Sequence, residues 1–191
     1  MFLFAKPTEP TINKMILEQC DQPFSYAEVG ATNTKLPPDY AVLHGRITLG
    51  HGAATFARAV EAIGQWKMFD VPNVWLCWPN APIETGTTVA VLTRHFGFWS
   101  LNFCRIVYTI EENDAVRRRG FAYGTLREHA ESGEERFRVE WDRRSDGVTY
   151  DILSFSRPGN WKTRIATPVA GLLQRHFLRN SLNAMSRYCA G

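Results

Sequence analysis

One acidic residue occupies a position in this sequence where a strand would bury it. Residues 121–142, FAYGTLREHAESGEERFRVEWD, are typical of two strands joined by a polar turn. Side chains alternate between the two faces of a strand, so Glu135 should point to the same covered face as Phe137 and Val139. Burying a carboxylate without a partner is costly, so an inward Glu135 would require a cation, a ligand group or water.

The surroundings of Glu135 decide what chemistry it can do. Arg94 and Arg105, on neighbouring predicted strands, are candidates for the cation. Burial raises the pKa of a carboxyl group towards neutrality, which would make Glu135 a candidate general acid or base. The alternative is a bulge near Gly133 that shifts the register and turns Glu135 to solvent beside Glu134. The sequence leaves both alternatives open.

Four further residues are candidates for binding a ligand. Tyr123, Tyr150 and Trp75 suit a pocket wall, because their rings offer apolar area and a polar group. Each could equally be ordinary strand packing. His176 lies on the predicted covered stripe of the last helix, where it could hydrogen-bond a guest or be a satisfied core residue.

Other kinds of chemistry have no motif in this sequence. The five histidines and four cysteines form no HxxxH or CxxC pair, so we expect no metal and no cofactor. No serine nucleophile elbow is present. The widely spaced cysteines favour reduced thiols, and no signal peptide or long apolar run occurs, so a cytoplasmic protein is expected.

The basic residues are concentrated at the end of the chain. From Ile152 to Gly191 there are six basic residues and no acidic one, whereas the first 151 residues carry 16 basic and 19 acidic residues, or −3. This asymmetry indicates either one solvated helix face or a surface for an acidic protein or a membrane. Nucleic-acid binding is not expected, because Arg117–Arg119 lies in a strand connection without interleaved aromatic residues.

The periodicity of the apolar residues predicts two helices and one strand before a strand-rich middle and a long last helix. A helix is expected over Thr8–Cys20, a strand over Tyr40–Leu49 and a helix over Ala53–Lys67. Six strands follow, with short turns that favour antiparallel pairing: Val74–Trp78, Thr87–Phe96, Trp99–Glu111, Arg119–Leu126, Glu134–Asp142 and Val148–Ser156. The last helix is expected over Thr163–Tyr188.

This order predicts one α+β domain. A seven-stranded curved antiparallel sheet would wrap on the long C-terminal helix, and a cavity would remain where the two do not close tightly. Residues 1–38 would form an N-terminal helix and a surface strap, residues 39–188 the core, and residues 189–191 a tail.

Several segments also resemble a known family. PFSYAEVGAT, APIETGTTVAVL, FGFWSLNFCRIVY, GFAYGTLREHAESGEERF and SFSRP are similar, in this order, to uncharacterised protein family 0548 of bacteria and plants. The order of elements resembles the helix-grip fold of the START-like superfamily, which includes the birch-pollen allergen, lipid-transfer domains and polyketide cyclases. The resemblance to family 0548 implies no activity that can be assigned to single residues.

Three functions follow as hypotheses. The first is a carrier, sensor or sequestering module that binds a small apolar or amphipathic molecule between sheet and helix. The second is a START-like cyclase, dehydratase or hydrolase that uses Glu135 as general acid or base. The third is a module that docks on a membrane or protein through its basic C-terminal helix. The ligand, the oligomeric state and any catalysed reaction stay open.

Overall fold

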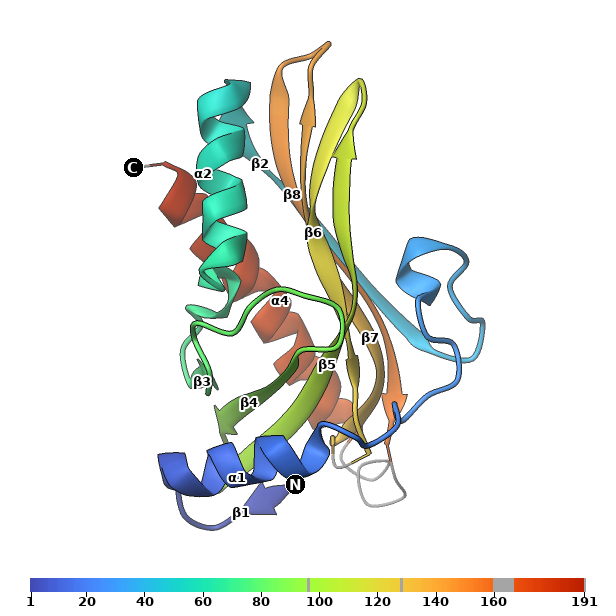
Figure 1. Cartoon of the computed structure of the whole chain (residues 1–191), viewed down its shortest axis with the longest axis vertical. Coiled ribbons are helices and arrows are strands. Elements are labelled where there is room, and N and C mark those ends of the chain that lie inside the picture. The colour runs from blue at the N-terminus through green and yellow to red at the C-terminus, as the bar shows by residue number, and fades with distance from the viewer. Residues whose placement is uncertain (96, 128, 160–166, 191) are drawn as a thin grey trace.

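One antiparallel sheet curls around a long C-terminal helix (Figure 1). The computed structural model describes residues 1–95, 97–127, 129–159 and 167–190, the last range with side chains from residue 171. The seven main strands pair in the order β2-β8-β7-β6-β5-β4-β3, and a short strand, β1, pairs with the beginning of β5. A curled sheet that grips a C-terminal helix is the helix-grip fold, which confirms the fold class expected from the order of elements.

The strands are long in the middle of the sheet and short at the β3 edge. Register shifts between Thr48 and Gly50 and between Ile106 and Tyr108 mark irregularities that increase the local twist and help the sheet to curl. The strand bounds are β1 Phe2–Leu3, β2 Ala41–His51, β3 Val74–Leu76, β4 Thr88–Arg94, β5 Trp99–Asn113, β6 Val116–Thr125, β7 Glu131–Asp142 and β8 Gly147–Pro158.

Helices and turns lie on both faces of the sheet (Figure 1). The inner face is covered by α2 (Gly52–Gly64), the 3-10 turn η2 (Lys67–Phe69) and α4 (Thr167–Cys189). The outer face carries α1 (Glu9–Gln19) and the strap, which we define as residues 21–38 with the 3-10 turn η1 (Ala31–Asn33).

The main core fills the space between the inner face and its helices. Phe121, Phe137 and Ile152 point inward from neighbouring strands and are fully buried. Phe56 of α2 and Met185 of α4 close over them. Removal of this apolar area from water holds α4 against the sheet, at about 25 cal/mol per Å² of apolar surface.

Two smaller cores attach the N-terminal segments to the outer face. Ile12 and Ile16 of α1 pack against Leu92, Leu101 and Phe103. Tyr26 of the strap and Tyr40, which follows the strap, pack against Phe155, and the rings of Tyr40 and Phe155 meet edge to face at 5.0 Å. The outer face of the sheet is therefore covered at the end near the N-terminus.

The predicted helices and strands are present, with bounds that differ by a few residues. The predicted start of the last helix at Thr163 lies outside the described residues, and the helix is described from Thr167. Strand β1 was not predicted, because a two-residue strand has no periodicity of its own. It exists through its pairing with Trp99 and Ser100.

Candidate ligand-binding site on the inner face

Glu135 lies on the inner face of the sheet, among apolar side chains. It is opposite Tyr123 in the register of β6 and β7, and Phe137 lies two residues further along β7. Tyr123 and Phe137 both belong to the main core, so Glu135 shares their face. The pairing of β7 with β6 and β8 shows no register shift near Gly133, so the alternative of a bulge there is wrong.

The Glu135 carboxyl group has a tyrosine as its hydrogen-bond partner. The Tyr123 hydroxyl donates to Oε2 of Glu135 at 2.8 Å. Burial raises the pKa of Glu135 to about 7, although the hydrogen bond from Tyr123 lowers it in part. No lysine or arginine among the described residues contributes to that shift. Near neutral pH this carboxyl group can therefore exist with or without its proton.

Three other ionisable side chains lie within electrostatic range of Glu135. Burial is the main cause that raises the pKa of Tyr123, of Tyr150 and of the Cys104 thiol, and the charge of Glu135 adds to each shift. The Tyr150 hydroxyl also lies 3.3 Å from Oγ of Ser181 on α4. We call Glu135, Tyr123, Tyr150 and Cys104 the inner cluster.

Aromatic rings occupy most of the space around the inner cluster. The Phe69 ring of η2 lies 5.8 Å from that of Phe137 and 5.4 Å from that of Phe177 on α4. Two pockets of the described residues, one lined by Phe2, Leu3, Phe4 and Phe98 and the other lined in part by Arg46, Arg118 and Glu140, lie away from the space between sheet and α4 where a cavity was expected. Glu135 is nevertheless only partly buried.

The other four candidates lie away from the inner cluster, so the placement expected for them is wrong. Arg105 is on the outer face, where its guanidinium group donates to the carbonyl oxygens of Gln19, the last residue of α1, and of Gln22. Trp75 and the exposed Arg94 both lie beside Trp99, whose ring packs towards α1. Neither arginine can therefore pair with Glu135.

His176 is exposed on α4 and does not face the sheet. The inward stripe of this helix runs through Phe177, Ser181 and Met185. His176 precedes Phe177 by one residue, which corresponds to a rotation of about 100° around the helix axis. A second histidine, His129 in the turn before β7, is partly buried, and burial lowers its pKa to about 3.

Glu134, next to Glu135 in the sequence, forms a second buried site that sequence reasoning missed. Its carboxylate lies on the outer face under the strap and accepts hydrogen bonds from the Tyr26 hydroxyl at 2.8 Å and from the backbone N–H of Thr32 at 3.0 Å. The N–H of Gly30 and the Thr32 hydroxyl also donate to it. The signal was the adjacent pair of acidic residues, since alternation turns one of them to each face.

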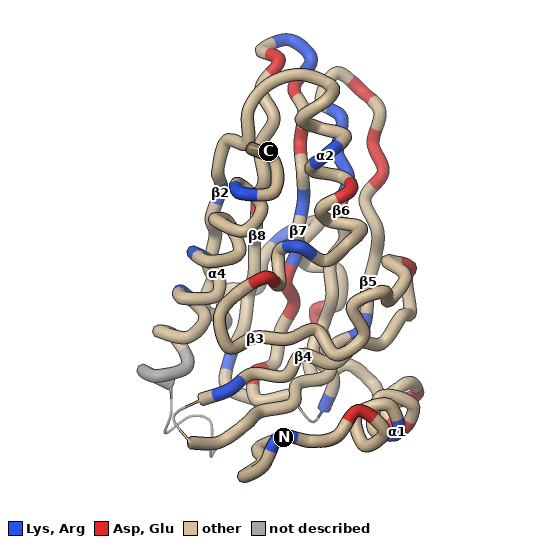
Figure 2. The backbone as a smooth tube through the Cα atoms, turned by 90° about the vertical axis from the view of Figure 1, so that its left-hand side faces the viewer, with Lys and Arg blue, Asp and Glu red and all other residues tan. Residues whose placement is uncertain are grey.

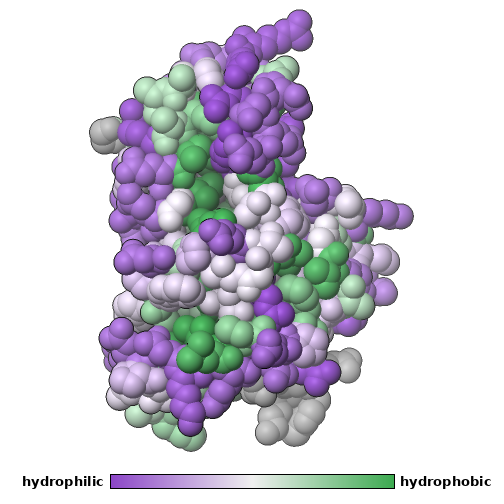
Figure 3. Space-filling model, viewed as in Figure 1, coloured by the Kyte–Doolittle hydropathy of each residue, from purple (hydrophilic) through white to green (hydrophobic). Residues whose placement is uncertain are grey.

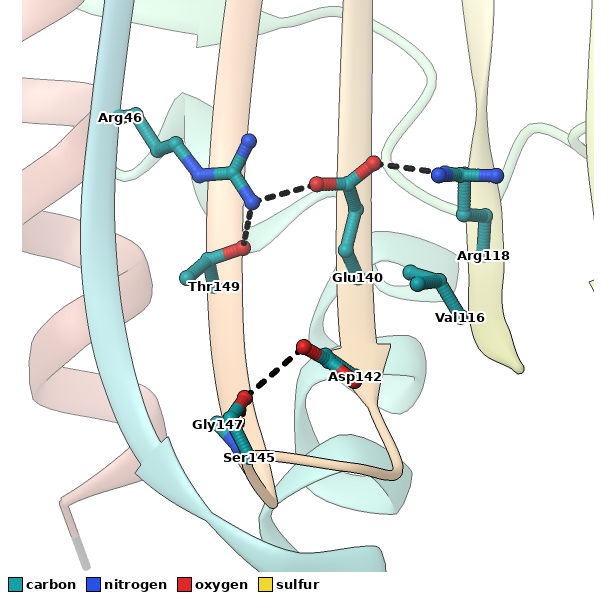
Figure 4. A pocket seen from close by; sticks show the side chains of 8 residues that line it. All are labelled: Arg46, Val116, Arg118, Glu140, Asp142, Ser145, Gly147 and Thr149. Atoms are coloured by element: carbon teal, nitrogen blue, oxygen red, sulfur yellow. Dashed lines mark hydrogen bonds and ion pairs between the residues drawn. The ribbon is translucent and has the colours of Figure 1, made fainter.

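A network of ion pairs covers the outer face beyond the strap. Glu140 lies between Arg46 and Arg118, with N–O distances of 2.5 and 2.7 Å (Figure 4). Asp151, almost fully buried, pairs with Arg136 at 2.9 Å and with His44. Positive and negative groups alternate here, which satisfies each charge within the sheet and leaves no single sign for a ligand to meet.

The described residues contain neither a candidate metal centre nor a candidate membrane span. No group of three or more His, Cys, Asp or Glu side chains there has the geometry to hold a metal ion. Among these residues, no helix combines the length and the apolar character that crossing a bilayer requires.

Comparison with known proteins places this chain among proteins of one family. Residues 25–184 match the model of a family described as "Domain of unknown function (DUF1990)". A UPF0548 protein of Dictyostelium discoideum is 37% identical over 203 residues, which cover 97% of this chain and 94% of that protein. A UPF0548 protein of Deinococcus radiodurans is 34% identical over 201 residues, with 98% of each chain covered.

Several solved structures of low sequence identity are similar to this chain over most of its length. A hypothetical protein of Helicobacter pylori is similar with a TM-score of 0.47 and 13% identity, covering 84% of this chain and 95% of that one. The protein Ara h 8.0201 is similar with a TM-score of 0.44 and 12% identity, over 79% and 98%. Human STARD10 is similar with a TM-score of 0.40 and 9% identity, over 93% and 81%.

Proposed function

The chain belongs to the DUF1990 family, also represented by the UPF0548 proteins. For this member of the family we propose that it binds a small apolar or amphipathic molecule at the inner cluster. The observation that carries this proposal is Glu135, a partly buried acidic residue on an otherwise apolar wall. Pockets for small molecules combine such a wall with a few polar groups that fix the orientation of the guest.

The covering of the inner face by α4 is uneven, and this supports access near Glu135. In the second half of α4, Ser181, Ala184 and Met185 are buried. None of residues 171–180 is buried. Phe177 belongs to this first, more exposed half of α4, and its ring lies next to that of Phe69, which in turn lies next to that of Phe137. A guest would therefore enter by displacing the first half of α4, with its polar group towards Glu135.

The chemistry of Glu135 defines the guest further. A carboxyl group with a pKa of about 7 can donate a proton to a carbonyl or hydroxyl oxygen, or pair as a carboxylate with an amine. A purely hydrocarbon guest would leave this group without a new partner. We therefore expect an apolar molecule with one hydrogen-bonding or basic group.

The test is the identity and amount of molecules that the purified protein retains. Native mass spectrometry and solvent extraction should find an apolar guest on the wild type, and a panel of fluorescent apolar probes should bind it. Glu135→Gln and Tyr123→Phe should weaken that binding. Arg94→Gln, which changes an exposed residue on the outer face, should leave it unchanged. Equal binding by Glu135→Gln and the wild type would reject the inner cluster as the site.

A second candidate function is a reaction catalysed at the same place, and one observation favours it. General acid–base catalysis is most efficient when the pKa of the group lies near the working pH, and that of Glu135 is about 7. If the guest is a substrate, Glu135→Gln should abolish its conversion even at concentrations that saturate the weakened binding. A guest recovered unchanged after long incubation with the wild type would support binding alone.

A further inference from the structure

The end of the molecule near the N-terminus carries an exposed apolar depression. Phe2, Leu3, Phe4 and Phe98 line it, and its volume is about 310 Å³. Phe4 is 98% exposed and Phe2 54%. Figure 3 shows hydrophobic atoms at the lowest tip of the molecule, beneath α1, where Figure 1 draws β1. We call these four residues the phenylalanine patch.

The patch is held in place by the sheet. Phe2 is opposite Ser100 in the pairing of β1 with β5. The ring of Phe2 meets that of Phe98 edge to face at 5.6 Å. His95 stacks on Phe98 at 4.8 Å, and its ring nitrogen lies 2.8 Å from the Ser100 hydroxyl. The rings of Phe2 and Phe98 therefore have fixed positions.

Cations lie beside the phenylalanine patch. Nζ of Lys6 is 5.6 Å from the Trp75 ring centre and 5.7 Å from that of Trp99. The guanidinium carbon of Arg94 is 5.9 Å from the Trp99 ring centre. Both cations lie against aromatic rings, and the strands of these rings carry the phenylalanine patch or lie beside it. The contacts with the rings therefore keep Lys6 and Arg94 close to the patch.

Three of the segments that meet at this end lack acidic residues, whereas α1, which lies beside β1, carries Glu9 and Glu18. Residues 1–8, 85–110 and 152–191 contain no Asp or Glu. They form β1, β4, most of β5 and the whole of α4, and the first described turns of α4 lie at the same end as β1 (Figures 1 and 2). Leu172 of α4 is 67% exposed there, and Arg175 is exposed too.

We propose that this end docks on an anionic lipid bilayer, with Phe2, Phe4 and Phe98 in the interfacial region and with Lys6 and Arg94 at the headgroups. Aromatic rings and basic side chains on one surface are the combination that binds anionic interfaces. A protein partner is less suited, because a stable protein interface buries about 1,200 Å² or more with matching shapes. Single protruding rings need no matching shape in a bilayer.

This docking surface differs from the third hypothesis raised by the sequence, which placed the contact on the basic last helix. Here the apolar contribution comes from the N-terminal segment and the β4–β5 turn. It is also separate from the proposed ligand site. Glu135→Gln should therefore leave bilayer binding unchanged, and failure of one proposal says nothing of the other.

The experiment is co-sedimentation of the full chain with vesicles of phosphatidylcholine alone and of phosphatidylcholine with phosphatidylglycerol. The wild type should bind the anionic vesicles more tightly, and less tightly at about 0.5 M salt than at about 0.05 M. Phe2→Ala/Phe4→Ala should lower the partition coefficient about tenfold or more. Lys6→Gln/Arg94→Gln should lower it on anionic vesicles only.

Matched controls distinguish vesicle binding through the phenylalanine patch from nonspecific hydrophobic adsorption. Val29→Ala/Val42→Ala removes two other exposed apolar side chains, each 45% exposed, from the strap and from β2, and should bind as the wild type does. Phe4→Asp is a second patch variant that cannot harm folding through lost packing, because Phe4 is 98% exposed. It should also lose binding.

Three results would overturn the proposal. One is a wild type that sediments with neither kind of vesicle. The second is a Phe4→Asp variant that binds anionic vesicles as well as the wild type does. The third is a patch variant that changes the molecular mass in solution and not the vesicle binding, since the patch would then join two copies of this chain.

Discussion

At the scale of single residues, the adjacent pair Glu134 and Glu135 contains most of what is unusual in this protein. Glu134 accepts four hydrogen bonds under the strap. Glu135, on the inner face, has the Tyr123 hydroxyl as its donor and a raised pKa. The hydrogen-bonded carboxylate of Glu134 thus stabilises the fold, whereas ionisation of Glu135 in apolar surroundings costs stability at neutral pH.

Replacement of Glu135 by Gln should change the pH dependence of stability. Burial raises the pKa of Glu135 from 4.5 to about 7, so its favourable contribution is complete below pH 4.5 and is lost as the pH rises through 7. Gln cannot ionise. Glu135→Gln should therefore be more stable than the wild type by about 1–3 kcal/mol at pH 8 and nearly equal at pH 4. Urea unfolding at both pH values measures this, and a variant less stable at pH 8 would contradict it.

At the scale of elements, the strap is attached to the sheet through a few buried contacts. Glu134 binds the backbone of η1, and Tyr26 lies directly over Gly124 of β6. The Arg136 guanidinium group donates to the Thr32 carbonyl oxygen from the same side. Each contact involves one side chain, so a single substitution should reveal its contribution to the free energy of unfolding.

Glu134→Gln should destabilise the protein by roughly 2–4 kcal/mol, because an amide NH₂ would face backbone N–H donors that it cannot pair with. The expected sign at pH 8 is the reverse of that for Glu135→Gln, and the two variants are matched in size and chemistry. Amide hydrogen exchange should increase first at Gly30 and Thr32. Unchanged exchange in the strap would show that Glu134 does not hold it.

Gly124→Ala tests the close approach of the strap to β6. A Cβ at Gly124 would lie 2.1 Å from the Tyr26 hydroxyl oxygen, and Tyr26 is buried and cannot move aside freely. We expect a loss of about 2–4 kcal/mol in thermal or urea unfolding. Gly64→Ala is the control, since a Cβ there meets nothing within 4 Å in α2, and it should be neutral or slightly stabilising.

At the scale of the whole molecule, one helix closes the main core. Ser181, Ala184, Met185 and Cys189 of α4 are buried against the sheet, η2 and α2. Figure 2 shows basic residues and no acidic ones along α4. The helix is thus apolar towards the sheet and basic towards the outside, so it serves packing on one side and surface charge on the other.

Truncation of the chain after residue 166 should abolish cooperative folding. The inner face would expose fully buried residues such as Phe137 and Ile152 to water, a loss that exceeds the marginal stability of a domain of this size. Circular dichroism should then show no sigmoidal thermal transition. Removal of residues 190–191 alone should leave the transition in place. A cooperative transition in the truncated chain would show that the sheet folds without α4.

Much of the fold and part of the site could be predicted from the sequence. Alternation gave Glu135 the same parity as Phe137 and Val139, because the period of two holds along any strand without a bulge. Tyr123 and Tyr150, predicted only as possible wall residues, also lie on this face. The order of short strands and a long last helix predicted the curled sheet. The same rule could not place Arg94, Arg105 and Trp75, since alternation groups residues of one strand and does not say which element covers which face.

The amino-acid sequence by itself determined the elements and their order, since these depend on local periodicity. It left the direction of Glu135 open, and the unbroken register of β7 with its neighbours decided that this residue points inward. Only the tertiary structure decided that α1 and the strap cover the outer face, that Glu134 is buried beneath them, and that His176 points away from the sheet. These depend on contacts between residues far apart in the chain, which no local pattern encodes.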